Sequence, residues 1–236
     1  MELSLKALSF NRHKKPVLDS VSATIPSTGL TCLLGTNGAG KTTLLRMLCG
    51  ELKPVSGTFF IGDIDAGALS QKDISRYFSI IPQKSPAPPY LTVSEMVALG
   101  RFHPQRALWW RLNNEDKSKI RVAITRCQIE NFKDRKVAEL SGGEQQRVWL
   151  SFGLASDKSF LILDETLDGM DVFAKSSFFY LLREIAREGK GIILATHDLS
   201  MVTECADKTI VLRQGKVVYE GAANVNLQQF LANDDE

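Results

Sequence analysis

The chain has 236 residues, of which 44% are hydrophobic and 24% charged, so one large domain, or a core with an inserted lobe, accounts for the length. The 29 Lys and Arg against 27 Asp and Glu leave a net charge of +2, too small a surplus for a broad nucleic-acid surface. Apolar runs fall short of the ~20 residues of a membrane helix, and four widely spaced cysteines do not indicate a zinc site or a disulfide framework.

The first third of the chain is predicted to be rich in strands. Residues 1–30 have a β pattern that ends in a turn at Ser27–Gly29. Leu44, Leu45 and Leu48 recur at helical spacing before Gly50, a residue typical of helix ends. The expected elements after residue 30 are a strand at 30–34, a helix at 41–49 and a strand at 58–61.

The middle of the chain changes to a helical pattern. Residues 82–89 hold half of the eight prolines and are expected to form an extended connector. Thr92 and Glu95 have the spacing of a capping box, which predicts a helix from there to about Leu99. The helical pattern then continues to about Ser156.

The last third again alternates strands with helices. Strands are expected at 160–163 and 192–196, with a helix at 174–188 between them, and a hairpin is expected around Gln214-Gly215. This order predicts a three-layer α/β core with a mainly parallel sheet, interrupted by a helical insert. The acidic end, 234–236, is expected to be a frayed tail.

A glycine-rich loop follows the strand at 30–34 and matches the phosphate-loop pattern GxxxxGK[ST] without a mismatch. Glycines let successive backbone N–H groups point at phosphate oxygens, and the helix that follows adds its positive end. Lys41 is expected to bridge the β- and γ-phosphates, and the hydroxyl of Thr42 to ligate Mg²⁺. The alternative is a strand-to-helix turn without a ligand. The predicted nucleotide-binding residues here are Gly35, Thr36, Asn37, Gly38, Ala39, Gly40, Lys41, Thr42 and Thr43.

Two carboxylates end the apolar strand at 160–163. In a parallel sheet, ligands sit at the carboxyl ends of the strands. Asp164 is therefore expected to hold Mg²⁺ through water, and Glu165 to act as the base that polarises an attacking water. The alternative is a pair of surface acids at a strand end.

The string Leu140-Ser141-Gly142-Gly143-Glu144-Gln145-Gln146-Arg147 is the most specific in the chain. Ser141 and Glu144 have capping-box spacing, and a capped helix start with two glycines is also an anion site. The string resembles the signature motif of the ATP-binding cassette family, and the resemblance extends from end to end. It implies a single domain over 1–236, with a phosphate-loop nucleotide-binding core and antiparallel β subdomain at 1–85 and 157–236, and a helical signature subdomain at about 86–156.

The same resemblance implies that ATP binds between two subunits arranged head to tail. Ser141, Gly142, Gly143 and Glu144 of one subunit would then close over the γ-phosphate held by the other. The second subunit is either another copy of this chain or a paralogous ATPase.

Further sites follow from the resemblance. Gln83 is similar to the glutamine that reaches Mg²⁺ and the lytic water, and His197 to the histidine that contacts the γ-phosphate. Phe10 stands near the place of the aromatic residue that stacks on adenine, although a strand Phe is as often part of a core. Residues 168–171 resemble the loop that touches the opposite subunit. The chain departs from the family at Thr166, where proline is usual, and at 157–158.

Several functions are compatible with this family. The resemblance favours the ATP-hydrolysing motor of a transporter over an ATPase of DNA repair or ribosomes, because no coiled-coil insert or second cassette is present. A phosphate-loop kinase or GTPase would leave the signature string unexplained. Nucleic acid is not expected as a partner.

Residues 91–101 resemble the helical lobe of bacterial importers for iron–siderophore, haem or cobalamin, with metal-ion importers as the alternative. This reading implies permease subunits in the membrane, whose coupling helix would dock near Gln83, and a periplasmic or lipoprotein substrate-binding protein. It places the chain at the cytoplasmic face of the membrane. Trp109 and Trp110 are expected either in an apolar docking patch or inside the helical lobe.

Overall fold

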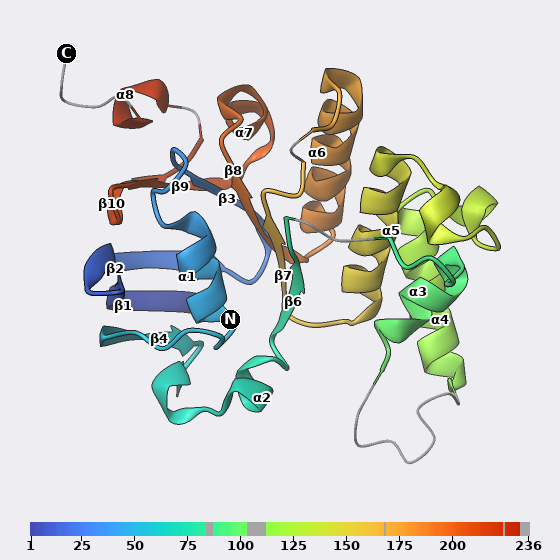
Figure 1. The fold of residues 1–236 in the computed structure, drawn as a ribbon, viewed down its shortest axis with the longest axis horizontal. Coiled ribbons are helices and arrows are strands. Elements are labelled where there is room, and N and C mark those ends of the chain that lie inside the picture. Colours follow the sequence, from blue (N-terminus) through green and yellow to red (C-terminus); the bar gives the residue numbers. More distant parts are fainter. Residues whose placement is uncertain (84–86, 103–111, 168, 224, 232–236) are drawn as a thin grey trace.

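Two β-sheets and the helices that pack on them make up the fold (Figure 1). The structure is a computed structural model, and it describes residues 1–83, 87–102, 112–167, 169–223 and 225–231. Trp109, Trp110, Asp168 and the acidic tail at 234–236, which were interpreted above, lie outside the described residues.

The smaller sheet is formed mainly by the N-terminal part of the chain. Its strands pair antiparallel in the order β2-β1-β4-β5. Alternate residues of the first strand, such as Leu3 and Leu5, are buried, as expected for a sheet with one face on the core. The antiparallel β subdomain is thus confirmed. Its strands are β1 (Glu2–Arg12), β2 (Lys15–Pro26), β4 (Ser56–Ile61) and β5 (Ile64–Asp65).

The larger sheet has the order β10-β9-β3-β8-β7-β6. From β9 to β6 every pairing is parallel, whereas β10 pairs antiparallel with β9. Gln214 and Gly215, with φ of 49° and 79°, form the turn between those two strands, as the hairpin prediction required. The strands are β3 (Gly29–Leu34), β6 (Phe78–Ile81), β7 (Phe160–Asp164), β8 (Gly191–Thr196), β9 (Lys208–Arg213) and β10 (Lys216–Gly221).

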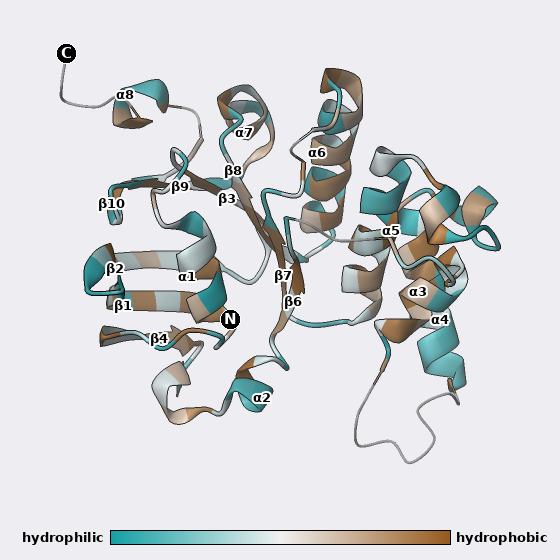
Figure 2. Cartoon of the chain, viewed as in Figure 1, coloured by the Kyte–Doolittle hydropathy of each residue, from teal (hydrophilic) through white to brown (hydrophobic). Residues whose placement is uncertain are grey.

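Both faces of the larger sheet are buried, which makes the core three-layered. In β7, Phe160 and Ile162 join one hydrophobic cluster while Leu161 and Leu163 join the other. Helix α1 (Lys41–Leu48) and the smaller sheet cover the first face. Helices α6 (Val172–Arg187) and α7 (Leu199–Cys205) cover the second. Figure 2 shows the hydrophobic colouring concentrated along these central strands, and the predicted fold class is confirmed.

Helices inserted between β6 and β7 form a separate helical lobe. Helices α3 (Val93–Leu99), α4 (Asn114–Arg126) and α5 (Gly142–Ala155) lie together beyond β6 and β7, on the side away from the smaller sheet (Figure 1). The capping boxes at Thr92 and Ser141 are both present, as predicted. Within the described residues, no helix combines the length and the apolar character that crossing a bilayer requires.

The helical pattern expected up to Ser156 is not continuous, which corrects the prediction. Helix α4 ends at its cap Cys127, because Gln128 adopts a left-handed φ of 58°. Two short 3₁₀ turns, η2 (Glu130–Phe132) and η3 (Val137–Glu139), then connect α4 to α5. The sequence pattern did not indicate strands β5 and β6 or helix α7. It also did not indicate the short elements η1 (Ala66–Ala68), α2 (Gln71–Ile74) and α8 (Gln228–Leu231).

The four cysteines are all buried and free. Burial raises the pKa of Cys49 and of Cys127 to about 12, because it disfavours the charged thiolate. Burial also raises the pKa of Cys32. At these positions the thiols act as small hydrophobic side chains.

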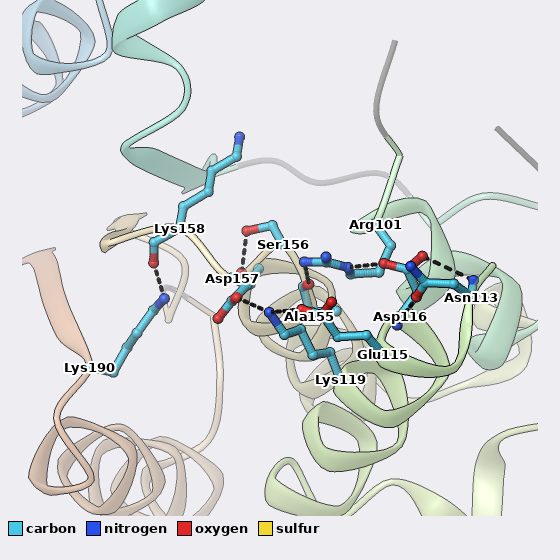
Figure 3. A network of polar contacts seen from close by, with 11 residues as sticks. Arg101, Asn113, Glu115, Asp116, Lys119, Ala155, Ser156, Asp157, Lys158 and Lys190 are labelled. Carbon is cyan, nitrogen blue, oxygen red and sulfur yellow. Dashed lines mark hydrogen bonds and ion pairs between the residues drawn. The ribbon is translucent and has the colours of Figure 1, made fainter. Parts of the chain in front are cut away.

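A buried ion pair joins the helices of the lobe (Figure 3). Arg101 Nε lies 2.9 Å from Asp116 Oδ1, and the two side chains are only 8% and 0% exposed. Arg101 also donates a hydrogen bond of 3.1 Å to the carbonyl of Ala155, the last residue of α5. The pair therefore fixes the end of α3 against the start of α4 and the end of α5.

Replacement of Asp116 by alanine is expected to destabilise the protein by about 3–5 kcal/mol, because the buried Arg101 charge would lose its partner. Glu115→Ala is the matched control, because Glu115 precedes Asp116 on the same helical turn but is exposed and pairs with Lys119. Urea unfolding would measure the free energy of unfolding of both variants. An equal loss of this free energy in the two variants would contradict the proposed importance of the buried pair.

Candidate functional site

The glycine-rich loop between β3 and α1 presents unused backbone donors at the start of a helix. Gly40 is the N-cap of α1 with a left-handed φ of 106°, and no side chain caps this helix end. A Cβ at Gly35 would lie 2.5 Å from the carbonyl oxygen of Leu212, so only glycine fits there. The first N–H groups of α1 are thus available to an anion, as the phosphate-loop prediction requires.

Lys41 lies inside this loop and is almost completely buried. Its ammonium donates to the carbonyls of Gly35 (2.7 Å) and Thr36 (3.1 Å). It also forms an ion pair of 3.0 Å with Glu165. The lysine is therefore held at the mouth of the loop, where a phosphate contacting the α1 N-terminus would meet its charge.

A hydroxyl and a carboxylate stand together beside the loop. Thr42 Oγ1 donates a hydrogen bond of 3.1 Å to Asp164 Oδ1. Burial raises the pKa of Asp164, and the neighbouring Glu165 charge contributes in the same direction. A buried carboxylate and a hydroxyl oxygen are ligands that suit Mg²⁺, and a dication here would compensate the desolvated charge. Two of the three residues predicted to hold the metal, Thr42 and Asp164, are thus in hydrogen-bond contact and fit the ion, while the third, Gln83, contacts Glu165.

Glu165 occupies a position defined by both sheet pairing and side-chain contacts. Its N–H donates to the carbonyl of Ala195 in β8, and its φ is 48°, an uncommon conformation for a residue other than glycine. One carboxylate oxygen contacts Lys41, and the other accepts a hydrogen bond of 3.1 Å from Gln83 Nε2. The structure therefore brings Gln83, Lys41 and Glu165 together.

Thr166, the departure from the family pattern, is buried directly after Glu165. It is 1% exposed, and no partner for its hydroxyl oxygen occurs among the described residues. The substitution leaves the contacts of Glu165 with Lys41 and Gln83 intact.

A cavity of about 510 Å³ lies over the loop and has room for a nucleotide. Arg12 and Val17, at the hairpin between β1 and β2, form part of its wall, and sequence analysis did not identify them. Phe10, expected against adenine, is half-buried and packs on the core beneath the smaller sheet. The alternating pattern of β1 could not reveal which of its residues reach the loop. The residues that line this cavity are Arg12, Val17, Asn37, Gly38, Gly40, Lys41, Thr42, Thr43, Gln83 and Glu165.

The signature residues are exposed at the start of α5. Ser141 accepts a hydrogen bond from the N–H of Glu144, whose carboxylate accepts from the Ser141 N–H at 2.8 Å. The N–H and the hydroxyl of Ser141 both donate to the Glu144 carboxylate, which lowers the pKa of Glu144. A Cβ at Gly142 would meet nothing within 4 Å, so this helix end is open. Helix α5 lies on the opposite side of β7 from α1, and one chain does not bring the signature to the phosphate loop (Figure 1).

The remaining predicted residues lie at the same edge of the larger sheet. His197 directly follows β8 and is exposed. Of the loop at 168–171, Met170 approaches the signature helix, since a Cβ on Gly143 would lie 3.5 Å from Met170 Cε. Asp171 caps α6 by accepting a hydrogen bond of 2.9 Å from Ala174.

Comparison with known sequences identifies relatives over nearly the whole chain. Residues 18–168 match the ABC transporter family. The chain is 32% identical over 222 residues to the iron(3+)-hydroxamate import ATP-binding protein FhuC of Bacillus subtilis, covering 94% of this chain and 82% of the relative. It is 33% identical over 217 residues to the ferric enterobactin transport ATP-binding protein FepC of Escherichia coli, covering 91% and 79%.

Solved structures show the same architecture. The chain superposes with a TM-score of 0.83 on CbiO1 from Clostridium perfringens, part of the CbiONQ ABC transporter complex, at 27% identity and with 97% and 90% of the two chains covered. It superposes equally well, with a TM-score of 0.83, on the ADP conformation of the ATP-binding cassette MJ1267. That match is 23% identical and covers 94% and 91% of the chains, so it supports the fold alone.

Replacement of Lys41 by alanine should weaken ATP binding by about 30-fold or more. The phosphates would lose a cation, and the Glu165 carboxylate would be left without the ammonium that pairs with it. Isothermal titration calorimetry would measure the affinity, with Lys53→Ala, an exposed lysine outside the cavity, as control. Unchanged micromolar affinity in Lys41→Ala would argue against the phosphate-loop assignment.

Proposed function

The chain belongs to the ATP-binding cassette transporter family, and from this premise we propose that it is the ATP-hydrolysing subunit of a bacterial importer for an iron chelate. The family membership makes it an ATPase. The observation that carries the proposal of cargo class concerns two relatives, 32% and 33% identical, each matched over more than nine-tenths of this chain. They are ATP-binding proteins of iron(3+)-hydroxamate import and of ferric enterobactin transport.

The phosphates of ATP would be held by the loop before α1. Its backbone N–H groups and the Lys41 ammonium supply positive charge, and the cavity over the loop has the size of a nucleotide. Arg12 and Val17, from β1 and β2, also line the cavity and would contact the base or ribose. Phe10 remains a prediction as an adenine-stacking residue.

Thr42, Asp164 and Gln83 would hold Mg²⁺. When bound, the ion neutralises charge that develops on the β- and γ-phosphates. Glu165, at the end of β7, would orient water for in-line attack, since its carboxylate lies 3.0 Å from Lys41 and 3.1 Å from Gln83. His197 would steady the γ-phosphate from the end of β8.

Two chains would be needed to complete each site. The open start of α5 carries Ser141 and Gly143, and no residue of this helix start lines the cavity over the phosphate loop. A head-to-tail arrangement of this chain with a second copy or a paralogous ATPase would place the two N–H-rich helix starts on either side of one triphosphate. Closure on ATP and reopening after hydrolysis would then drive membrane subunits.

The partners in the membrane would be permease subunits, served by a periplasmic or lipoprotein substrate-binding protein. The chain would then work at the cytoplasmic face of the membrane as a peripheral subunit. A metal-ion importer is the second candidate, because the resemblance of residues 91–101 also extends to that class.

Replacement of Glu165 by glutamine should reduce ATP turnover by a factor of about 100 or more while ATP still binds, because the carboxamide cannot accept the proton. The variant should accumulate as a dimer in size-exclusion chromatography with ATP. Adding Ser141→Arg, which would obstruct the open helix start, should return it to a monomer. Near-normal turnover in Glu165→Gln would remove Glu165 from the role of base.

Uptake of radioactive iron supplied as a ferric siderophore tests the cargo class. A strain lacking this gene should lose uptake of at least one ferric chelate, and the wild-type gene but not the Glu165→Gln variant should restore it. Uptake of free cobalt or nickel in the same strain is the comparison. Loss of metal-ion uptake with intact chelate uptake would support the second candidate instead.

A further inference from the structure

A cavity of about 160 Å³ lies between the helical lobe and the core, and it shares no lining residue with the cavity over the phosphate loop. Helix α4 supplies one wall, and the end of α5 and the segments that follow α5 and α6 supply the other. Since one water needs only ~10–15 Å³, a small polyatomic ion fits here with water beside it. The lining residues are Ser118, Lys119, Val122, Ala123, Arg126, Leu154, Asp157 and Lys190.

Three basic side chains line this cavity from two sides. Lys119 and Arg126 belong to α4, whereas Lys190 comes from the core. Figure 3 shows Lys119 and Lys190 on either side of Asp157. Ser118 adds a hydroxyl that can also donate a hydrogen bond. Among the described lining residues Asp157 is the only acid, so the composition of the wall favours an anion.

Lys190 is the cation that most needs a counter-charge. Its ammonium donates a hydrogen bond to the carbonyl of Lys158, and within the described ranges no carboxylate forms an ion pair with it. Burial lowers the pKa of Lys190, and the charge of Arg126 acts in the same direction, whereas Asp157 acts against them. An ammonium has several donors, so a contact with one carbonyl leaves others for a ligand.

The acids that pair with the other two cations lie toward solvent. Lys119 pairs with Glu115 and Asp157, and their side chains are 65% and 53% exposed. Arg126 pairs with Glu188, which is 48% exposed. Ion pairs between exposed groups contribute little to stability, because water solvates each partner almost as well. Both cations of α4 can therefore turn toward an ion in the cavity at a low cost in free energy.

This arrangement of donors suits a phosphate group better than a carboxylate. A phosphate group is tetrahedral and carries about −1.5 to −2 charges at neutral pH, so its oxygens can reach donors on opposite walls. A carboxylate has a single charge and oxygens in one plane. The guanidinium of Arg126 can bind a phosphate through two parallel hydrogen bonds. A nucleotide does not fit, because sites for ligands of that size have roughly 300 Å³ or more.

We propose that this cavity binds a phosphate group, either free or carried by a small metabolite, and holds it between the helical lobe and the core. Lys190 contacts the group from the core, and Lys119 and Arg126 contact it from α4. Asp157 stands at one of the two positions, 157 and 158, where the sequence departs from its family. The site is accordingly a property of this chain, and it is separate from the loop that would hold ATP.

Amide chemical shifts of the isotope-labelled protein test the site residue by residue. Inorganic phosphate and glycerol phosphate are titrated separately, with sodium chloride keeping the ionic strength constant. The amides of Lys119, Arg126 and Lys190 report on this cavity, and those of Gly38 and Gly40 report on the phosphate loop. We expect saturable shifts at the cavity with a dissociation constant on the order of 1 mM. Saturation by inorganic phosphate identifies the free ion as a ligand, and saturation by glycerol phosphate alone identifies a phosphorylated metabolite.

Variants measure the contribution of the lining cations. Lys190→Met keeps the aliphatic stem but not the charge, and it should weaken binding at the cavity about tenfold without changing binding at the phosphate loop. Arg126→Gln, at a side chain that is 41% exposed, should weaken it in the same way and is the second variant if Lys190→Met does not fold. Lys117→Met, on the exposed surface of α4, is the matched control and should bind as wild type.

Three results would overturn the proposal. The first is a shift at the cavity amides that sodium chloride alone reproduces, which would reflect screening of surface charges. The second is saturation confined to the phosphate loop with either compound. The third is equal affinity at the cavity in Lys190→Met, Arg126→Gln and Lys117→Met. None of these results depends on ATP hydrolysis or on the cargo, so the proposed function would remain standing.

Discussion

The site depends on the register of three parallel strands, β3, β8 and β7. Strands β3 and β7 flank β8, and the pairs Leu34↔Thr196 and Asp164↔Ala195 bring their carboxyl ends to the same edge. The loop after β3 supplies Lys41 there, and the end of β7 supplies Glu165, so that their charges meet at 3.0 Å. A strand slipped by two residues would separate the lysine from both acids, and no side-chain adjustment would restore the contact.

Much of this arrangement could be predicted because it is encoded locally. The phosphate loop combines glycine positions with a lysine, and the capping boxes at Thr92 and Ser141 combine a hydroxyl with a glutamate three residues later. In each case the residue types and their spacing determine the backbone conformation. The buried strand before Asp164 could also be predicted from the sequence, since parallel strands with both faces covered contain continuous apolar residues.

The parts that could not be predicted depend on contacts across the chain. Strand β6 is only four residues long, and its place at the sheet edge comes from pairing with β7, in which Phe78 pairs with Phe160 much later in the sequence. The positions of Arg12 and Val17 at the cavity depend on irregular pairing between β1 and β2, which shifts register near Phe10. Alternation along β1 gives no sign of these shifts. The same limit applies to the end of α4, where the chain turns at Gln128 without a glycine or proline.

The helices of the lobe are held to one another by specific contacts. The buried pair of Arg101 with Asp116 holds the lobe together internally. Gly100 permits close packing of α3 on α5, because a Cβ there would lie 2.5 Å from the carbonyl of Phe152. A displacement of one of these helices would therefore carry the others with it. A groove beside Lys158 lies at the boundary of the lobe with the core.

The buried cysteines have a practical consequence for following such a displacement. All four thiols are enclosed by the two hydrophobic clusters, and the raised pKa of Cys49 and Cys127 keeps these thiols protonated at neutral pH. A maleimide dye or spin label would therefore react preferentially with a cysteine newly introduced on the surface. Distances between lobe and core during turnover become measurable by fluorescence or electron resonance in an otherwise native background, without a cysteine-free parent.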